Sequence, residues 1–271
     1  MGRFRSPKGL VGLVVLSAVL LVAIAAPLFI RQDLATQMHM ALRLRPPSAA
    51  HWLGTDQLGR DLLYRVLLGA RTSLTIAVSA VFMSIALGLP LGIVSGYAGG
   101  WIDGLLMRFV DAMLSFPALL LALTISAMLG PSVPNTIIAI GVAFTPFLAR
   151  IIRGEALRVA QMPYVEAARA AGATGLTMIV RQVLPNVLPL VIVQGTISLA
   201  FAILAEAGLS FLGLGTQPPQ SSWGLMIQAS RDYLDVAPWT ALVPGAAVAL
   251  TVLALNMFGD VLRDVLDPRA R

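Results

Sequence analysis

Long uncharged stretches separate short charged segments along this chain. No charged residue lies between Lys8 and Arg31, and none lies between Arg71 and Asp103. The hydrocarbon core of a bilayer is about 30 Å thick and takes ~20 consecutive apolar residues in helical form. These two runs therefore predict membrane-spanning helices at residues 10–30 and at about residues 73–97. The first has no clear small-x-small cleavage pattern after it, so we interpret it as a retained anchor and not as a signal peptide.

The uncharged run of residues 112–149 is interrupted near its middle by glycine and proline residues at positions 130–134. It is slightly short for two spans and a turn, so we expect a tight helical hairpin whose first helix extends back toward Leu106. That extension brings Arg108 and Asp111 to the membrane edge, where their spacing of three residues suggests a structural ion pair. A gating role for Asp111 is the alternative, because ionisable groups near a span are costly and often functional.

Two further runs predict spans at about residues 187–205 and 238–261, which brings the total to six. Glu206 follows the fifth span at its outer end, where it would either line a substrate entrance or sit at the water interface. Residues 207–230 are uncharged but contain many glycines and prolines, so they predict a structured loop or re-entrant element. Residues 60–71 carry apolar side chains at helical spacing, which predicts an amphipathic segment along the membrane surface.

Composition places the chain in lipid as an all-α membrane protein. Hydrophobic residues make up 58% of it, charged residues 12%, and the mean hydropathy is +0.85, against roughly 25% charged residues in soluble domains. With the N-terminus inside, 12 of the 19 lysines and arginines fall on the inner side, as the positive-inside rule favours. Six spans then put residues 1–9, the loop 154–186 and the tail 263–271 in the cytoplasm. The loops 31–72 and 206–237 lie outside, and residues 73–262 form the core transmembrane domain.

Several functions are excluded by residues that the chain lacks. It has no cysteine, which excludes disulfides and thiolate sites. A nucleotide-binding Walker loop needs a lysine followed by serine or threonine, and the single lysine, Lys8, precedes Gly9. Protease motifs are missing, and His39 and His51 lack the neighbours of a metal site. The arginine excess is a topology signal, so we expect no nucleic acid partner.

The loop of residues 154–186 predicts a bent pair of short helices. Pro163 suits a helix start, the residues after it are good helix formers, and Gly172 fits the position just beyond a helix end. A second helix is expected to start at Thr174 as N-cap and to stop before Pro185, since proline disfavours helix in the preceding residue. The alanines of the first helix leave its surface bare, with Glu166 and Arg169 as charged groups. The loop either fits into a groove of another protein or is an ordinary alanine-rich loop.

The sequence of this loop resembles the cytoplasmic coupling loop of ABC-importer permeases. The resemblance lies in Glu166-Ala167-Ala168, in Gly172, and in Leu184-Pro185, with Gln182 where the common pattern has isoleucine. Five other blocks, at residues 51–61, 96–101, 209–215, 218–224 and 264–269, are similar in the same order to the C-type permease of dipeptide, oligopeptide and nickel importers. The resemblance therefore covers nearly the whole chain.

This resemblance implies the type I ABC-importer permease fold in a bacterial inner membrane. It implies a non-catalytic subunit with no cofactor of its own, ATP and Mg being bound by partner ATPase subunits. The partners would be a second homologous permease, two ATP-binding subunits, an extracytoplasmic substrate-binding protein and membrane lipid. The contact residues for the ATPase would be Glu166, Ala167, Ala168, Arg169, Gly172, Leu184 and Pro185.

The substrate path and the cargo stay open at this point. Asp111, Glu206 and Trp223 are candidates for the pathway or its gate, and Trp223 is also a candidate contact for the binding protein. The family's members make short peptides the expected cargo, with nickel or another small solute as the alternative. An ion-coupled secondary carrier is the rival class, although the central spans lack charges and no internal repeat is evident.

Overall fold

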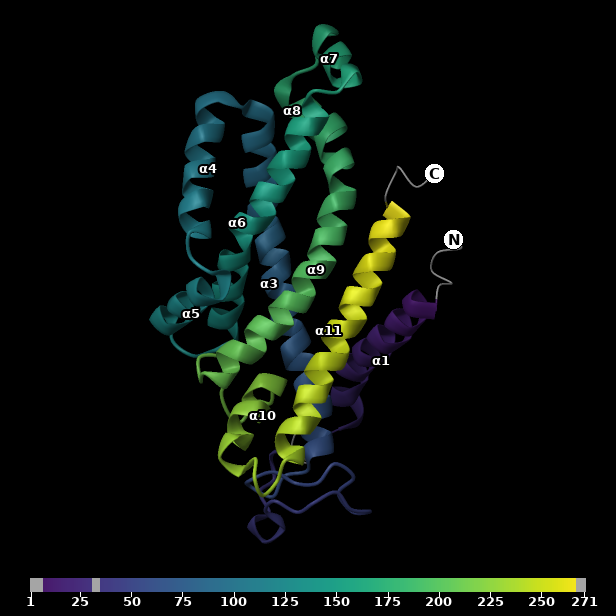
Figure 1. Ribbon diagram of the computed structural model, residues 1–271, viewed down its shortest axis with the longest axis vertical. Coiled ribbons are helices and arrows are strands. Elements are labelled where there is room, and N and C mark those ends of the chain that lie inside the picture. The colour runs from purple at the N-terminus through teal and green to yellow at the C-terminus, as the bar shows by residue number, and fades with distance from the viewer. Residues whose placement is uncertain (1–6, 31–34, 267–271) are drawn as a thin grey trace.

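A computed structural model describes residues 7–30 and 35–266, and every regular element in these ranges is helical apart from one isolated bridge between Thr55 and Asp61. The long helices are α1 (Pro7–Phe29), α3 (Leu62–Ala98), α6 (Val133–Ala160), α9 (Leu184–Phe211) and α11 (Trp239–Leu266). The shorter elements are η2 (Met40–Leu42), α4 (Gly100–Leu114), α5 (Ala118–Leu129), α7 (Pro163–Ala170), α8 (Gly175–Met178), η3 (Ile179–Val183), α10 (Trp223–Ser230) and η4 (Arg231–Tyr233). Figure 1 shows the long helices as one elongated bundle.

The expected six spans correspond to five long apolar helices and one broken pair. The pair is α4 and α5, which bend by 85° at the residues between them. The predicted hairpin of residues 112–149 is therefore made of α5 and α6. Its first helix, α5, is only the second half of the broken span. Pro117 forces the break, because its ring favours an extended conformation in Phe116 and ends the helix.

The second span begins earlier than the sequence predicted, and the predicted surface segment at residues 60–71 is wrong. Residues 62–71 are the first turns of α3, which starts at Leu62 and runs without interruption to Ala98. Asp61 caps this start, because its carboxylate accepts a hydrogen bond from the Leu63 amide at 2.8 Å. Leu62 and Arg65 are buried, so this stretch packs inside the protein instead of lying on the lipid surface.

The helix expected to stop before Pro185 does not stop there. Residues 175–211 form one apolar helical span, in which η3 is a π-helical turn between α8 and α9. The Leu184 amide donates to the Ile179 carbonyl, five residues back. This wider turn relieves the clash between the proline ring and the preceding turn. The predicted loop 154–186 is correspondingly shorter, since α6 continues to Ala160.

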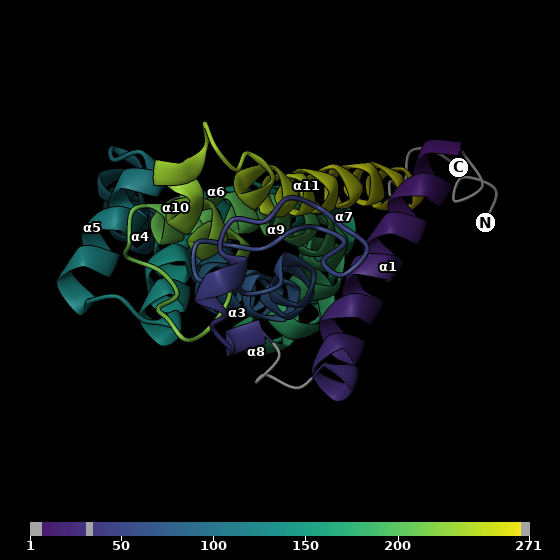
Figure 2. The same ribbon diagram turned by 90° about the horizontal axis from the view of Figure 1, so that it is seen from below.

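The two ends of the bundle differ in what they carry. Helix α7 projects at one end, and the segment of residues 35–61 lies with α10 at the other (Figure 1). Seen from below, this segment crosses the ends of α3 and α11 (Figure 2). Most of the first and last expected segments, residues 1–6 and 267–271, lie outside the described residues.

Buried charge holds the 35–61 segment onto the bundle. The Asp56 carboxylate lies 2.7 Å from Nε of Arg60 and 3.4 Å from Nε of Arg65, and all three side chains are buried. Trp239 donates from its indole nitrogen to the Thr55 carbonyl at 3.4 Å. The segment is therefore tied to both α3 and α11.

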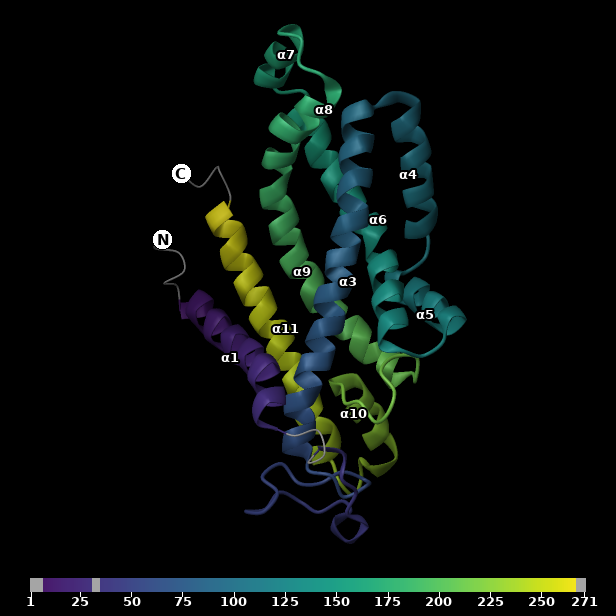
Figure 3. The ribbon, with the colours of Figure 1, turned by 180° about the vertical axis from the view of Figure 1, so that it is seen from behind.

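The core centres on the contact between α3 and α6. Seen from behind, α3 runs through nearly the full length of the bundle (Figure 3). Gly88, Gly92 and Gly96 repeat every four residues and lie against α6, where a Cβ on Gly92 would come within 2.7 Å of the Ala149 carbonyl oxygen. Small residues at this spacing let two helices approach closely, as membrane interiors require.

Candidate functional site

Helix α7 presents an exposed surface of small side chains at its end of the molecule. Glu166, Ala167, Arg169 and Gly172 are all exposed. Ala168, which was expected on the same bare surface, is turned partly inward and packs against the core cluster below. The guanidinium carbon of Arg169 lies 6.0 Å from the centre of the Tyr97 ring, within the range of a cation–π contact.

One buried side chain anchors this exposed helix. Val165 is fully buried among Val159, Met178 and Val183, which come from α6, α8 and η3. Pro163 lies in the first turn of α7, as predicted. The helix is therefore exposed on one side and packed on the other against the helices that cross the membrane.

The turn after α7 has a defined geometry that requires glycine. The Ala173 amide donates to the Ala168 carbonyl at 3.1 Å, and the Gly172 amide donates to the Arg169 carbonyl at 3.0 Å. These two bonds form a Schellman motif, whose penultimate residue adopts a left-handed conformation. Gly172 has φ +85°, and no atom lies within 4 Å of the place its Cβ would occupy. The glycine is therefore needed for its backbone conformation and not for space.

The second half of the predicted loop joins this turn to the fifth span. Thr174 caps α8 as predicted, by accepting from the Thr177 amide. Leu184 packs against the same buried cluster as Val165, whereas Pro185 is exposed and lines a cavity of about 520 Å³ between α6, α9 and α11. The structure thus brings the expected contact residues to one end of the bundle, although Leu184 and Pro185 lie at the base of the projection and not on α7 itself.

Asp111 makes an ion pair, but not with the predicted partner. Its carboxylate contacts the guanidinium of Arg150 on α6, and both side chains are about half exposed. Asp111 and Arg150 are 39 positions apart in the chain. The three-residue spacing between Arg108 and Asp111 therefore predicted the wrong partner. A gating role for Asp111 stays a prediction.

Glu206 and Trp223 lie in one buried polar cluster near the other end. Glu206 is fully buried, and its carboxylate accepts hydrogen bonds from Ser73 at 3.0 Å and Ser210 at 2.8 Å. Trp223 is also buried, and its indole donates to the Val66 carbonyl at 3.0 Å. Of the two settings considered for Glu206, the water interface is wrong, because the carboxylate is buried and its hydrogen-bond partners are serines. A pathway role for either residue stays a prediction.

Sequence analysis missed a second charged cluster on α4. Asp103 accepts from Nε of Arg153 on α6 at 2.5 Å and also from the hydroxyl of Ser95 on α3. It holds the Gly100 end of α4 against both helices. The only sequence signal for this pair is that both residues are charged, because Asp103 and Arg153 lie 50 positions apart.

The family comparison covers most of the chain. The model described as "Binding-protein-dependent transport system inner membrane component" matches residues 88–271. The match includes α7, the Schellman turn, Glu206 and Trp223. It leaves out α1, residues 35–61 and most of α3, up to Leu87.

Individual relatives extend the similarity to nearly the whole length. The dipeptide transport system permease protein DppC of Alkalihalophilus pseudofirmus is 43% identical over 98% of this chain and 88% of its own. The glutathione transport system permease protein GsiD of Escherichia coli is 44% identical over 83% of this chain and 74% of its own. Among solved structures, an inward-facing MetNI methionine ABC transporter matches with a TM-score of 0.63 and 19% identity, over 76% of this chain and 98% of that one. At that identity the likeness shows the fold.

Proposed function

Because this chain belongs to the family of binding-protein-dependent transport inner membrane components, we propose that it imports short peptides and is driven by an ATPase that docks on α7. It is a permease subunit of an ABC importer in the inner membrane, and such subunits work in a complex with an ATPase and a substrate-binding protein. The finer composition that we propose is a second homologous permease, two ATP-binding subunits and one binding protein. ATP and Mg would be bound by the ATPase subunits, with no cofactor in this chain.

The observation that carries the coupling proposal is the two-sided packing of α7. Its exposed side offers Ala167 and Ala170 for close backbone approach and Glu166 for a charged contact. Its buried side is fixed through Val165 to three other helical elements. A displacement of the docked ATPase would therefore move α7 together with α6, α8 and η3, which is the rigid-body type of transition.

The direction of the chain in the membrane follows from the same assignment. An ATPase acts in the cytoplasm, so α7 would face inward and the 35–61 segment outward. The Pro7 end of α1 and the Leu266 end of α11 point toward the α7 end in Figure 1. Both termini would then be cytoplasmic, in agreement with the distribution of basic residues.

The proposed cargo rests on the names of the relatives. These name dipeptide and glutathione transport, so short peptides are the chemical class that they share. The binding protein would make the first selection among peptides. Nickel is not supported by this chain, since no group of three or more histidine, aspartate or glutamate side chains within residues 7–30 and 35–266 could hold a metal ion.

The test separates ATP hydrolysis from uptake in the reconstituted complex. Glu166→Lys reverses the charge on the docking side, and Gly172→Val cannot adopt φ +85° without strain. We expect both variants to insert and assemble. The amount of peptide imported per ATP hydrolysed should fall to a small fraction of the wild-type ratio. Asp260→Lys on exposed α11 and Gly154→Ala on α6, where a Cβ meets nothing within 4 Å, are the matched controls.

Two outcomes would contradict the proposal. Uptake at the wild-type ratio in both α7 variants would remove the docking assignment. Uptake that persists with catalytically inactive ATPase subunits would point instead to an ion-coupled carrier.

A further inference from the structure

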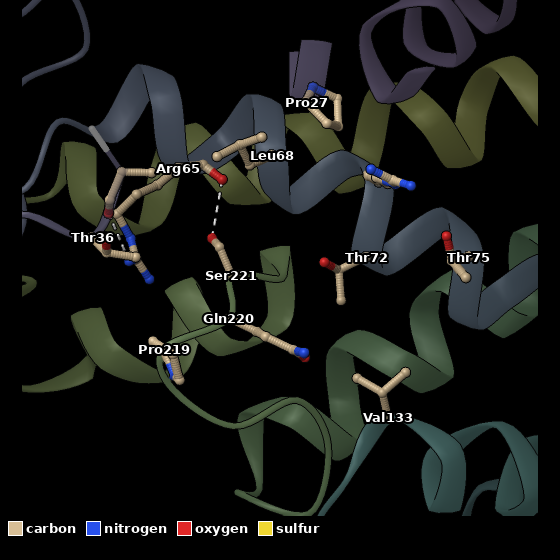
Figure 4. A pocket seen from close by; sticks show the side chains of 12 residues that line it. Pro27, Thr36, Arg65, Leu68, Thr72, Thr75, Val133, Pro219, Gln220 and Ser221 are labelled. Atoms are coloured by element: carbon tan, nitrogen blue, oxygen red, sulfur yellow. Dashed lines mark hydrogen bonds between the residues drawn. The ribbon is translucent and has the colours of Figure 1, made fainter. Parts of the chain in front are cut away.

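A cavity of about 310 Å³ opens near the outer end of the bundle, outside the buried clusters described above (Figure 4). Its walls come from α1, α3, the start of the 35–61 segment, the start of α6 and the segment of residues 219–221. The apolar part of the lining is Pro27, Ala35, Leu68, Val133 and Pro219, and the polar part is Thr36, Arg65, Arg71, Thr72, Thr75, Gln220 and Ser221. This volume lies at the lower end of the range for small-molecule sites, which is about 300–1,000 Å³.

The wall of residues 219–221 is fixed in place by hydrogen bonds to α3. The Ser221 hydroxyl donates to the Arg65 carbonyl at 3.0 Å, which Figure 4 shows as a dashed line. Two residues further on, Trp223 binds the Val66 carbonyl through its indole nitrogen. The cavity is therefore a built feature of the fold and not a gap under a loose loop.

Positive charge dominates the cavity. Two guanidinium groups line it, and none of its described lining residues is acidic. Arg65 is compensated by Asp56 at 3.4 Å and also donates to the Ala35 carbonyl at 3.4 Å. Arg71 is exposed, and within the part of the chain that the structure describes it makes no ion pair. A site with one uncompensated guanidinium favours an anionic group.

Three uncharged polar side chains in the cavity also lack partners. Thr72 and Thr75 lie three residues apart on one face of α3, and Gln220 points toward Thr72 from the opposite wall (Figure 4). None of the three makes a side-chain hydrogen bond among the described residues. Other threonines in the spans close their hydroxyls onto the carbonyl four residues back, namely Thr124, Thr136, Thr145, Thr196 and Thr251.

Thr75 and Gln220 are exposed and Thr72 is half-buried, so their polar atoms are accessible to a ligand that enters the cavity. Unpaired hydroxyls and an amide that face one cavity suit a ligand that hydrogen-bonds to them. We propose that the cavity receives the carboxylate end of the imported peptide on the outer side, with Arg71 binding the carboxylate and Thr72, Thr75 and Gln220 binding the adjacent amide. Arginine can hold a carboxylate through two parallel hydrogen bonds. The proposal rests on the peptide cargo assigned above.

The first test measures charge in the cavity with a single cysteine. The chain has none of its own, so Gln220→Cys in a complex with cysteine-free partners gives one reporter. Negatively charged sulfonatoethyl methanethiosulfonate should label it faster than the positively charged trimethylammonioethyl reagent. Adding Arg71→Gln should lower this rate ratio about tenfold, the lower limit of electrostatic effects on encounter rates, whereas Arg71→Lys should keep it. Arg231→Gln, at another exposed arginine of the same end, is the matched control and should also keep it.

The second test measures the ligand. Without the binding protein, millimolar dialanine should protect a Thr75→Cys reporter, and dialanine amide, which lacks the carboxylate, should not. Arg71→Gln should raise the dialanine concentration needed for protection about tenfold, as expected for one charge-assisted hydrogen bond. The complex is reconstituted in phosphatidylcholine vesicles, and a parallel set contains phosphatidylglycerol.

Three results would overturn the proposal: a rate ratio unchanged by Arg71→Gln, equal protection by dialanine and its amide, or protection by phosphatidylglycerol alone. The last would assign the cavity to a lipid headgroup. Uptake of dialanine by the wild-type complex with its binding protein is measured alongside. Uptake without protection rejects only the cavity, whereas failure of all peptide uptake rejects the proposed cargo.

Discussion

The close approach of α3 to α6 at Gly92 makes a sharp prediction about stability. A Cβ at this position would lie 2.7 Å from the Ala149 carbonyl oxygen and 2.7 Å from Cγ2 of Ile152. Both contacts must lengthen to at least 3.4 Å, where ordinary van der Waals contact begins. The obstructing atoms include backbone, so α6 itself has to move. We therefore expect Gly92→Ala to destabilise the subunit.

The magnitude follows from the packing. A retreat of about 0.5–1 Å forfeits a quarter to a half of each dispersion contact along the interface, and overpacking a well-filled core costs typically 1–3 kcal/mol. Taking about 2 kcal/mol from that range, the midpoint of thermal unfolding should fall by about 4–8 °C for a chain of this size. The higher helix propensity of alanine opposes this change by up to about 1 kcal/mol, so the observed fall lies toward the lower value.

The assay is thermal unfolding of the detergent-solubilised complex, followed by the loss of its size-exclusion peak. Gly104→Ala and Gly245→Ala are matched controls, because both glycines are helical and a Cβ meets nothing within 4 Å there. Their midpoints should equal that of wild type or exceed it by up to about 4 °C, because only the gain in helix propensity applies there. If Gly92→Ala melts together with the two controls, the close contact between α3 and α6 is not as described.

Three further predictions concern charged groups. Glu206→Ala should lower stability by about 3 kcal/mol, since it removes the buried acceptor of two serine hydroxyls, and Glu206→Gln should lower it less, because one acceptor oxygen remains; the same melting assay ranks them, and equal midpoints would contradict the account. Asp56→Asn leaves two buried guanidinium groups without their carboxylate, so protease added from the outer side should cleave the 35–61 segment faster than in wild type, and an unchanged rate would argue against the Asp56 cluster. The pair of Asp111 with Arg150 is about half exposed, so a double-mutant cycle should give a coupling energy below about 1 kcal/mol, and a clearly larger value would show that the pair is buried in the assembled complex.

Hydrophobic run length was enough to predict most of the fold. Uncharged stretches identified five spans and the second half of the broken one, whereas α4 carries Asp103, Arg108 and Asp111 and lies largely outside them. Pro163 and Gly172 predicted the start and the end of α7, and Thr174 predicted the start of α8. The errors fall where a local signal competes with packing. Arg65 looks like a surface residue in the sequence, but Asp56 compensates it in the folded chain, and the helix can therefore begin one turn before it.

The candidate sites were predictable only where they are local in sequence. The turn after α7 involves residues 168–173, which are close together in sequence. Gly172 was therefore enough to predict where the helix ends. The partners of Asp111, Glu206 and Asp103 come from other helices, and no spacing rule on one helix can identify them. Pro185 was misjudged for a related reason, since a π-helical turn is set by the neighbouring packing and has no simple sequence signature.

The uninterrupted helix of residues 175–211 has a consequence for communication across the membrane. At about 1.5 Å per residue its 37 residues reach roughly 55 Å, well beyond the ~30 Å hydrocarbon layer. This helix joins the base of α7 to Glu206 and the buried polar cluster around it. If an ATPase docks on α7 as proposed, and a binding protein docks at the opposite end, their effects are reciprocal, because the coupling free energy between two binding sites is shared. A binding protein that raises nucleotide affinity would then have its own affinity raised by nucleotide by the same factor.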